Sequence, residues 1–179
     1  MSVNKILTLT NTQTAARYYA QKLWQSETLY LLMRRNADVT PNAFALSDPH
    51  TRITWAETAD WVDSVSSSLQ DAGLSTGDRV SIWLPNRIEA IIVFLACSRN
   101  GYICNTSLHQ NYTAAEIVTL LESIKSKAVF YQVGYGADGQ SADVVKTLTG
   151  VDSLCQIYGL HPPNQVASPL PQGVHEFPD

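Results

Sequence analysis

Residues 78–105 read DRVSIWLPNRIEAIIVFLACSRNGYICN, and this stretch decides the fold. Val80 to Leu84 is a short apolar run that ends at a proline, as expected of a buried strand. The residues after Asn86 are apolar nearly all round, which is typical of a helix buried on most of its sides. Gly101 can take the left-handed conformation that ends a helix, and Tyr102 to Cys104 starts a second strand. A strand, a helix and a strand joined closely predict the βαβ unit of a parallel sheet.

Three of the predicted helices begin with an Asn or Thr followed three positions later by a Glu. The pairs are Thr54 with Glu57, Asn86 with Glu89, and Thr113 with Glu116. In a capping box the first side chain accepts from the backbone three residues on, and the Glu reaches back to the first backbone N–H. Capping explains all three glutamates, so we assign them no acid–base chemistry.

The remaining pattern extends this unit in both directions. It predicts helices at 14–24, 27–36, 55–72, 114–124 and 141–148, strands at 128–133 and 154–158, and a hairpin of 42–47 with 51–54. We therefore expect an α/β, Rossmann-like subdomain over 1–160, with a mainly parallel sheet of at least three or four strands and helices on both faces. Five of the eight prolines fall in 161–179, which we interpret as a Pro-rich linker or truncated loop.

Composition excludes several classes of function. The net charge of -4 and the absence of a basic stretch give no general attraction to nucleic acid or to an anionic membrane. No apolar run approaches the ~20 residues that span a bilayer, and the N-terminus lacks an apolar leader core, so we expect a cytoplasmic protein. Cys97, Cys104 and Cys155 have no metal-type spacing, and we expect buried, reduced thiols.

One glycine-rich segment matches a phosphate-binding pattern. Gly134 to Gly139 fits G-x-G-x-x-G between a predicted strand and a predicted helix. However, Asp138 places an anion where a phosphate would lie, and the following helix is short. A plain glycine-rich turn is the preferred interpretation, and a free-standing Rossmann-like nucleotide-binding module remains the alternative, which titration with NAD or FAD would test.

The other candidate site residues lie in the loop after the second strand. His109 follows that strand at its carboxyl end, where α/β folds tend to bind ligands. The four histidines share no metal-ligand spacing, so we predict no metal site. A serine nucleophile elbow and a Walker-type phosphate loop are both absent from the sequence.

Several segments in order resemble one enzyme superfamily. They are Arg52 to Glu57, Gly73 to Val80, Leu84-Pro85-Asn86, Ala96 to Gly101 and Tyr112 to Ile117. This set resembles the start of an adenylate-forming, AMP-binding enzyme, the superfamily of acyl- and aryl-CoA synthetases, luciferases and peptide-synthetase adenylation domains. The resemblance covers roughly Leu29 to Val133. Within it, Ser107 to Asn111 and Gly134 to Asp138 are similar to acyl-CoA ligases of the cyclohexanecarboxylate type.

The resemblance implies a parent enzyme that uses ATP and Mg²⁺ to activate a carboxylic acid as an acyl-adenylate and then transfers the acyl group to CoA. It places the catalytic residues later in the chain, so we expect none here, no cofactor bound to this fragment, and the rest of the polypeptide as its partner. His109 and Asn111 would lie at the edge of a CoA or substrate channel. Some relatives have an arginine at the Asn111 position that touches a CoA phosphate, and Asn111 cannot supply that charge. An adenylation domain that feeds a carrier protein is the alternative.

Overall fold

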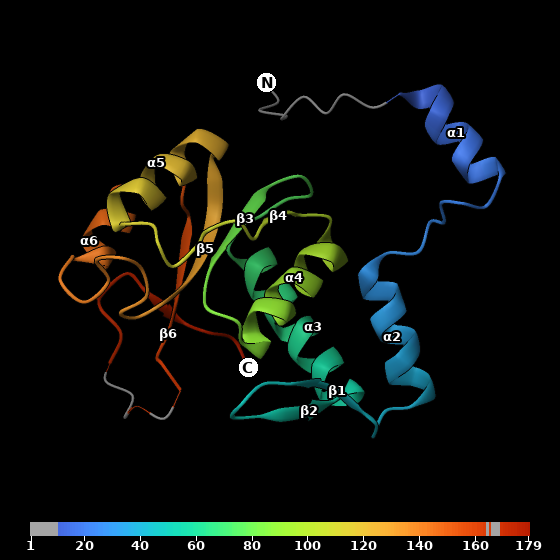
Figure 1. Cartoon of the computed structure of the whole chain (residues 1–179), viewed down its shortest axis with the longest axis horizontal. Helices are drawn as coiled ribbons and strands as arrows, with labels where there is room; N and C mark the ends of the chain where they lie inside the picture. Colours follow the sequence, from blue (N-terminus) through green and yellow to red (C-terminus); the bar gives the residue numbers. More distant parts are fainter. Residues whose placement is uncertain (1–10, 164, 166–168) are drawn as a thin grey trace.

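The computed structural model of the chain describes residues 11–163, 165 and 169–179. Its helices are α1 (Thr12–Ala20), α2 (Leu29–Val39), α3 (Trp55–Asp71), α4 (Ile88–Asn100), α5 (Ala114–Ile124) and α6 (Val144–Thr149). Its strands are β1 (Phe44–Ser47), β2 (Arg52–Thr54), β3 (Arg79–Trp83), β4 (Ile103–Asn105), β5 (Ser126–Gln132), β6 (Gln156–Leu160) and β7 (His175–Glu176). Figure 1 shows their arrangement.

Five strands form one sheet in the order β4-β3-β5-β6-β7, and every neighbouring pair is parallel. β3 has a partner on either side and all of its residues are buried, which confirms it as the predicted central strand. β1 and β2 form a separate antiparallel hairpin, as predicted. The predicted α/β fold with a mainly parallel sheet is therefore confirmed.

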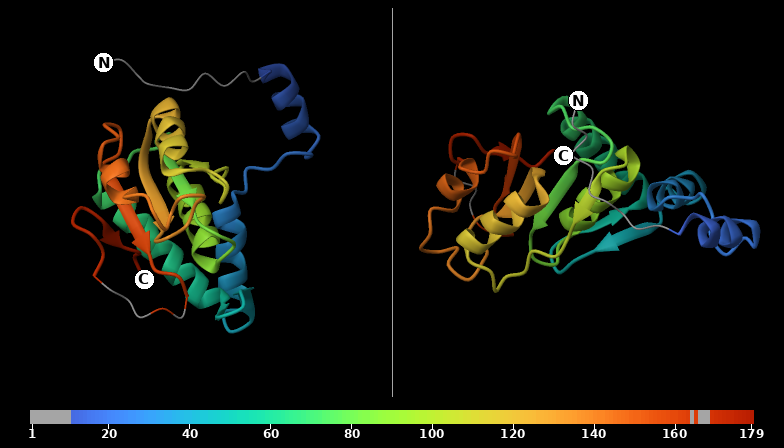
Figure 2. Two further views of the ribbon diagram at one scale, coloured as in Figure 1. Left: turned by 60° about the vertical axis from the view of Figure 1, so that its left-hand side comes forward. Right: turned by 90° about the horizontal axis from the view of Figure 1, so that it is seen from above.

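Helices cover both faces of this sheet (Figures 1 and 2). Side chains of β3 and β5 alternate between two hydrophobic cores, because successive residues of a strand point to opposite faces. Val80 and Phe130 belong to the core shared with α3 and α4. Trp83 and Tyr131 belong to the core shared with α5 and α6. Burial on both faces explains why these strands are nearly continuous apolar runs.

The start of α4 differs from the prediction. Its N-cap is Arg87, which makes no side-chain capping bond, and Asn86 lies one residue before it. The backbone N–H of Ile88 instead donates to Oδ2 of Asp48, 3.4 Å away in the hairpin turn. Glu89 accepts from the guanidinium of Arg87. The predicted capping box at Asn86 is wrong, because a tertiary contact and an ion pair take its place.

α4 also leaves one apolar face open. Ile92 and Val93 are fully buried, but Ile91 is 45% exposed and Phe94 is 36% exposed. The helix is therefore buried against the sheet and the neighbouring helices, and not on its opposite side. Six of its 13 residues are buried, and Ile91, Phe94 and Arg99 are its exposed positions, so the prediction of burial on most sides is confirmed and one narrow face stays open.

The other two capping boxes are confirmed. The backbone N–H of Thr54 donates to Glu57 at 2.7 Å, and that of Thr113 donates to Glu116 at 2.8 Å. In each pair the Thr hydroxyl also donates to the carboxylate. These hydrogen bonds, first from the backbone and then from the hydroxyl, lower the pKa of both glutamates.

We expect Thr113→Ala to raise the pKa of Glu116 toward its ordinary value, since the variant removes one of the two donors. A carboxyl whose pKa is depressed in the folded state stabilises the fold above its unfolded pKa, and this contribution is lost as the pH falls through the folded pKa. The variant should therefore lose less stability on acidification than the wild type. Carboxyl ¹³C shifts followed against pH give the measurement, and Glu57 in the same sample is the control. Equal shifts at Glu57 and Glu116 would contradict the assignment.

The C-terminal segment returns to the sheet. β7 pairs with β6 through Tyr158 and Gly159, and the sequence did not predict this strand. Phe177 then packs edge-on against Trp61 of α3, with ring centroids 5.6 Å apart. The indole N–H of Trp61 donates to the carbonyl of Pro178 at 2.7 Å. Residues 169–179 thus contact α3 and the sheet, within the stretch interpreted from sequence as a linker or loop.

Candidate functional site

The candidate site is the edge of the sheet at which β3, β4, β5 and β6 end. Because these strands are parallel, the loops that leave them emerge together. They comprise residues 84–87, 106–113, 133–143 and 161–163. Ligands of open α/β sheets bind outside the carboxyl ends of the strands. The side chains that these loops bring together are therefore the candidates for a binding site.

His109 and Asn111 both lie in the 106–113 loop, and both are exposed. The backbone carbonyl of His109 accepts from the indole N–H of Trp83 at 3.3 Å and from the backbone N–H of Tyr112 at 3.2 Å. The imidazole lies 6.0 Å from the Tyr112 ring, centroid to centroid. The loop is thus anchored through its backbone to the end of β3, and it presents the two side chains to solvent.

The glycine-rich turn packs against that same loop. The backbone N–H of Ala137 donates to the carbonyl of Tyr112 at 2.9 Å. Oδ1 of Asp138 accepts from the backbone N–H of Ala114 at 2.9 Å, at the start of α5. A Cβ on Gly136 would meet the Trp83 ring, and α6 begins only at Val144. The turn is therefore packed against Trp83 and does not lead directly into a helix, and Asp138 serves as a structural acceptor.

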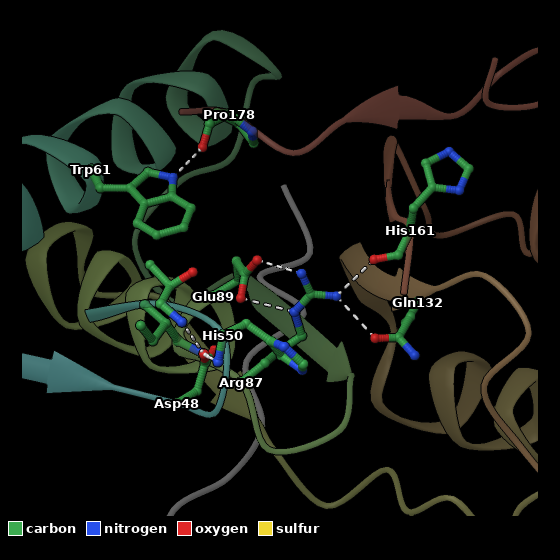
Figure 3. A network of polar contacts seen from close by, with 10 residues as sticks. Asp48, His50, Trp61, Arg87, Glu89, Gln132, His161 and Pro178 are labelled. Carbon is green, nitrogen blue, oxygen red and sulfur yellow. Dashed lines mark hydrogen bonds and ion pairs between the residues drawn. The ribbon is translucent and has the colours of Figure 1, made fainter. Parts of the chain in front are cut away.

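A largely buried ion pair joins three of the strand ends. Figure 3 shows Arg87 between Glu89 and Gln132. Its Nε donates to Oε2 of Glu89 at 2.8 Å, and Nη2 donates to Oε1 of the same carboxylate. Nη1 donates to Oε1 of Gln132 at 2.9 Å and to the carbonyl of His161 at 3.1 Å. The sequence analysis did not predict this network. The one feature of the sequence that could have indicated it is the charged pair Arg87 and Glu89, which lies between an apolar strand and an apolar helix.

A cavity of about 350 Å³ opens beside this ion pair. It lies between the hairpin turn of β1 and β2 and the first turns of α4. Most of its lining is apolar, including Leu46, Pro49 and Ile91, whereas Arg87 and Asp48 supply polar atoms at one end. The backbone N–H of His50, with those of Thr51 and Ile88, lowers the pKa of Asp48, so this end holds a carboxylate.

The described residues hold no group of three or more His, Cys, Asp or Glu side chains that could bind a metal ion. Over the same residues, no helix has both the length and the apolar composition needed to cross a bilayer.

Comparison with known proteins identifies the family. Residues 33–171 match the family described as AMP-binding enzyme. The chain belongs to this family. The match spans β3, α4 and the loops of the candidate site, as well as the Gly134 to Gly139 turn. It confirms the resemblance to adenylate-forming enzymes that the sequence indicated.

The relatives of this AMP-binding chain include acyl-CoA ligases. It is 32% identical over 108 residues to the mitochondrial medium-chain acyl-CoA ligase of Macaca fascicularis, which covers 59% of this chain and 17% of that protein. It is 28% identical over 129 residues to the medium-chain fatty-acid–CoA ligase of Escherichia coli, which covers 71% of this chain and 23% of that protein. The chain thus spans about a fifth of the length of these relatives.

Solved structures share the fold of this AMP-binding chain. The coronafacic acid ligase of Pectobacterium brasiliense superposes with a TM-score of 0.70 at 17% identity, over 84% of this chain and 28% of that one. At this identity the likeness shows the fold alone. The α/β fold is therefore that of the N-terminal region of acyl-CoA ligases. The cyclohexanecarboxylate type is not singled out by these relatives.

Proposed function

We propose that this chain is the N-terminal subdomain of an ATP-dependent acyl-CoA synthetase. The parent enzyme would activate a carboxylic acid as acyl-AMP, release pyrophosphate and transfer the acyl group to CoA. The observation that carries this proposal is the family match over residues 33–171, together with the acyl-CoA ligases among the relatives. ATP, Mg²⁺ and CoA are the cofactors of that parent reaction.

We infer that the fragment alone does not catalyse adenylation. Adenylation needs donors positioned on the phosphates and a cation that neutralises their charge. Within the described residues, Trp83 packs against Gly136 of the glycine-rich turn and Asp138 accepts from the backbone of Ala114, so both are already engaged in the fold. No group of three or more His, Cys, Asp or Glu side chains was found there either. These groups would come from the rest of the parent polypeptide.

The open face of α4 supports the rest of that polypeptide as the partner. Ile91 and Phe94 lie three residues apart on this face, and Ile91 also lines the cavity beside Arg87. Ile103 of β4 adds a further apolar side chain that is 45% exposed. An apolar surface of this kind is typical of a site that another protein surface covers. In the proposed parent enzyme, the remaining polypeptide would bury it.

His109 and Asn111 are proposed to line the edge of the CoA or substrate channel. Both are exposed on the loop that leaves β4 at the carboxyl edge of the sheet. Asn111 carries no charge, so it would contribute at most a hydrogen bond to a phosphate of CoA. A loop anchored to Trp83 through its backbone would hold these side chains in place.

The proposal is tested by measuring pyrophosphate release with ATP, CoA and a panel of carboxylic acids. We expect none from this chain alone, with the E. coli medium-chain fatty-acid–CoA ligase as the positive control. We expect acid-dependent release when the chain is extended by the polypeptide that follows it in its gene. Release by the isolated chain would overturn its assignment as a non-catalytic subdomain. If the extended protein is folded but releases no pyrophosphate with any acid of the panel, the assignment of the parent reaction is overturned.

A further inference from the structure

Two of the three cysteines lie on the same side of the sheet. Cys97 is in the last turns of α4 and is 1% exposed. Cys104 is in β4, where it pairs in register with Val80 of β3. Neighbours in register point to the same face of a sheet, and Val80 faces the core that contains Cys97. Cys104 packs against that core as well. The two thiols therefore lie in the same core, one on a helix and one on the neighbouring strand.

The turn between them brings the strand back beside the helix. Gly101 takes a left-handed conformation with φ of 71°. The backbone N–H groups of Gly101 and Tyr102 both donate to the carbonyl of Cys97, the latter at 2.9 Å. β4 thus starts immediately after a turn that is hydrogen-bonded to the last turn of α4. A hydrogen bond to the Cys104 thiol, and then burial, raise the pKa of Cys97.

We propose that Cys97 and Cys104 form a reversible intramolecular disulfide when the protein meets a small oxidised thiol. The two cysteines would constitute a modification site at the edge of the sheet. β4 is the edge strand, and Cys104 is partly exposed while Cys97 is not. An oxidant in solution therefore reaches Cys104 first, and Cys97 acts second from the interior.

The chemistry is two successive thiol–disulfide exchanges. The Cys104 thiolate attacks one sulfur of glutathione disulfide, which forms a mixed disulfide and releases one glutathione thiolate. Cys97 then attacks the Cys104 sulfur, the bond to the second glutathione breaks, and the Cys97 proton passes to the leaving thiolate. The protein loses two electrons and two protons, and one glutathione disulfide becomes two glutathione thiols. The first step also removes the Cys104 thiol that raises the pKa of Cys97.

Cys155 provides an internal comparison. It is exposed, and its thiol donates to the carbonyl of Lys127 at 3.2 Å. The expectation of buried thiols is therefore wrong for Cys155, which precedes β6, two strands away from β3 in the sheet order. Since Cys155 lies outside the core that holds Cys97 and Cys104, its reaction is expected to end at the mixed disulfide. The same protein thus contains one cysteine pair that is expected to form an intramolecular disulfide and one cysteine that is expected to stop at the mixed disulfide.

The experiment treats the folded chain with glutathione disulfide, quenches it with an alkylating reagent, and maps the products by peptide mass spectrometry. We expect a linked Cys97–Cys104 peptide that is two hydrogens lighter than the reduced pair, and Cys155 carrying glutathione. The Cys155→Ser variant should give the same linked peptide, and a reducing thiol should restore both free cysteines. The Cys97→Ser variant should stop with glutathione on Cys104.

Two results would overturn the proposal. One is wild-type protein, folded by circular dichroism, in which Cys104 keeps its glutathione or does not react. The other is a linked peptide that joins Cys155 to either partner in preference to Cys97–Cys104. If Cys97→Ser fails to fold, the wild type and Cys155→Ser alone decide between these outcomes, because neither alters the core.

Discussion

Replacing Arg87 by Met is expected to lower the free energy of unfolding by about 3–5 kcal/mol, because it leaves Glu89 as an uncompensated buried charge. The two side chains are only 11% and 15% exposed, and the pair is bidentate. The variant also removes the donors that hold Gln132 and the carbonyl of His161. Urea unfolding followed by circular dichroism measures the loss.

Two further variants separate the buried pair from a general effect of losing an arginine. Arg35→Met breaks an exposed pair with Glu27, whose side chains are 60% and 41% exposed, and should cost at most about 1 kcal/mol. The double variant Arg87→Met/Glu89→Leu removes both buried charges and should recover much of the loss, since apolar replacements of buried pairs are often neutral. Similar losses for Arg87→Met and Arg35→Met would show that burial does not govern this pair.

Local sequence signals predicted the elements whose causes are local. The Thr-x-x-Glu pairs at Thr54 and Thr113 form capping boxes because each needs only four consecutive residues. Gly101 ends α4 because the left-handed conformation favours glycine. The apolar run at Val80 predicted a buried strand, and β3 is the centre of the sheet. The order of these elements along the chain, strand then helix then strand, was then enough to predict a parallel sheet.

Signals failed where distant residues decide the structure. Asn86 with Glu89 satisfies the same capping pattern, but Asp48 and Arg87 replace it. Two of the partners of Arg87, Gln132 and the carbonyl of His161, lie 45 and 74 residues along the chain, so no local pattern could indicate them. β7 is a two-residue strand at the sheet edge, too short for any alternation to be visible.

For the candidate site, the sequence indicated a loop but not the contacts that hold it, and the binding role of that loop stays a prediction. The carboxyl end of a parallel strand indicated the 106–113 loop with His109, and that loop does lie at the edge of the sheet. Its anchor, the indole N–H of Trp83, could not be foreseen, because Trp83 looked like an ordinary strand residue. The same ring explains why the G-x-G-x-x-G match is a packed turn.

Gly136→Ala is expected to lower the free energy of unfolding by about 2–6 kcal/mol. The residue has φ of +112°, a strained conformation for alanine that costs roughly 1–3 kcal/mol. A Cβ would also lie 2.5 Å from Cζ2 of Trp83, whose side chain is fully buried and cannot move aside without cost. Overpacking of this kind adds about 1–3 kcal/mol. Urea unfolding of the variant against the wild type is the measurement.

Gly77→Ala is the matched control, because Gly77 has φ of +88° and a Cβ at this position would meet nothing within 4 Å. Gly77→Ala should lose only the free energy that the left-handed backbone conformation costs alanine. The difference between its loss of unfolding free energy and that of Gly136→Ala therefore measures the clash with Trp83. In the double variant Trp83→Phe/Gly136→Ala, the smaller ring makes room for the methyl group. We therefore expect the double variant to lose less than the sum of the single losses. Strict additivity would mean that the turn is not packed on Trp83.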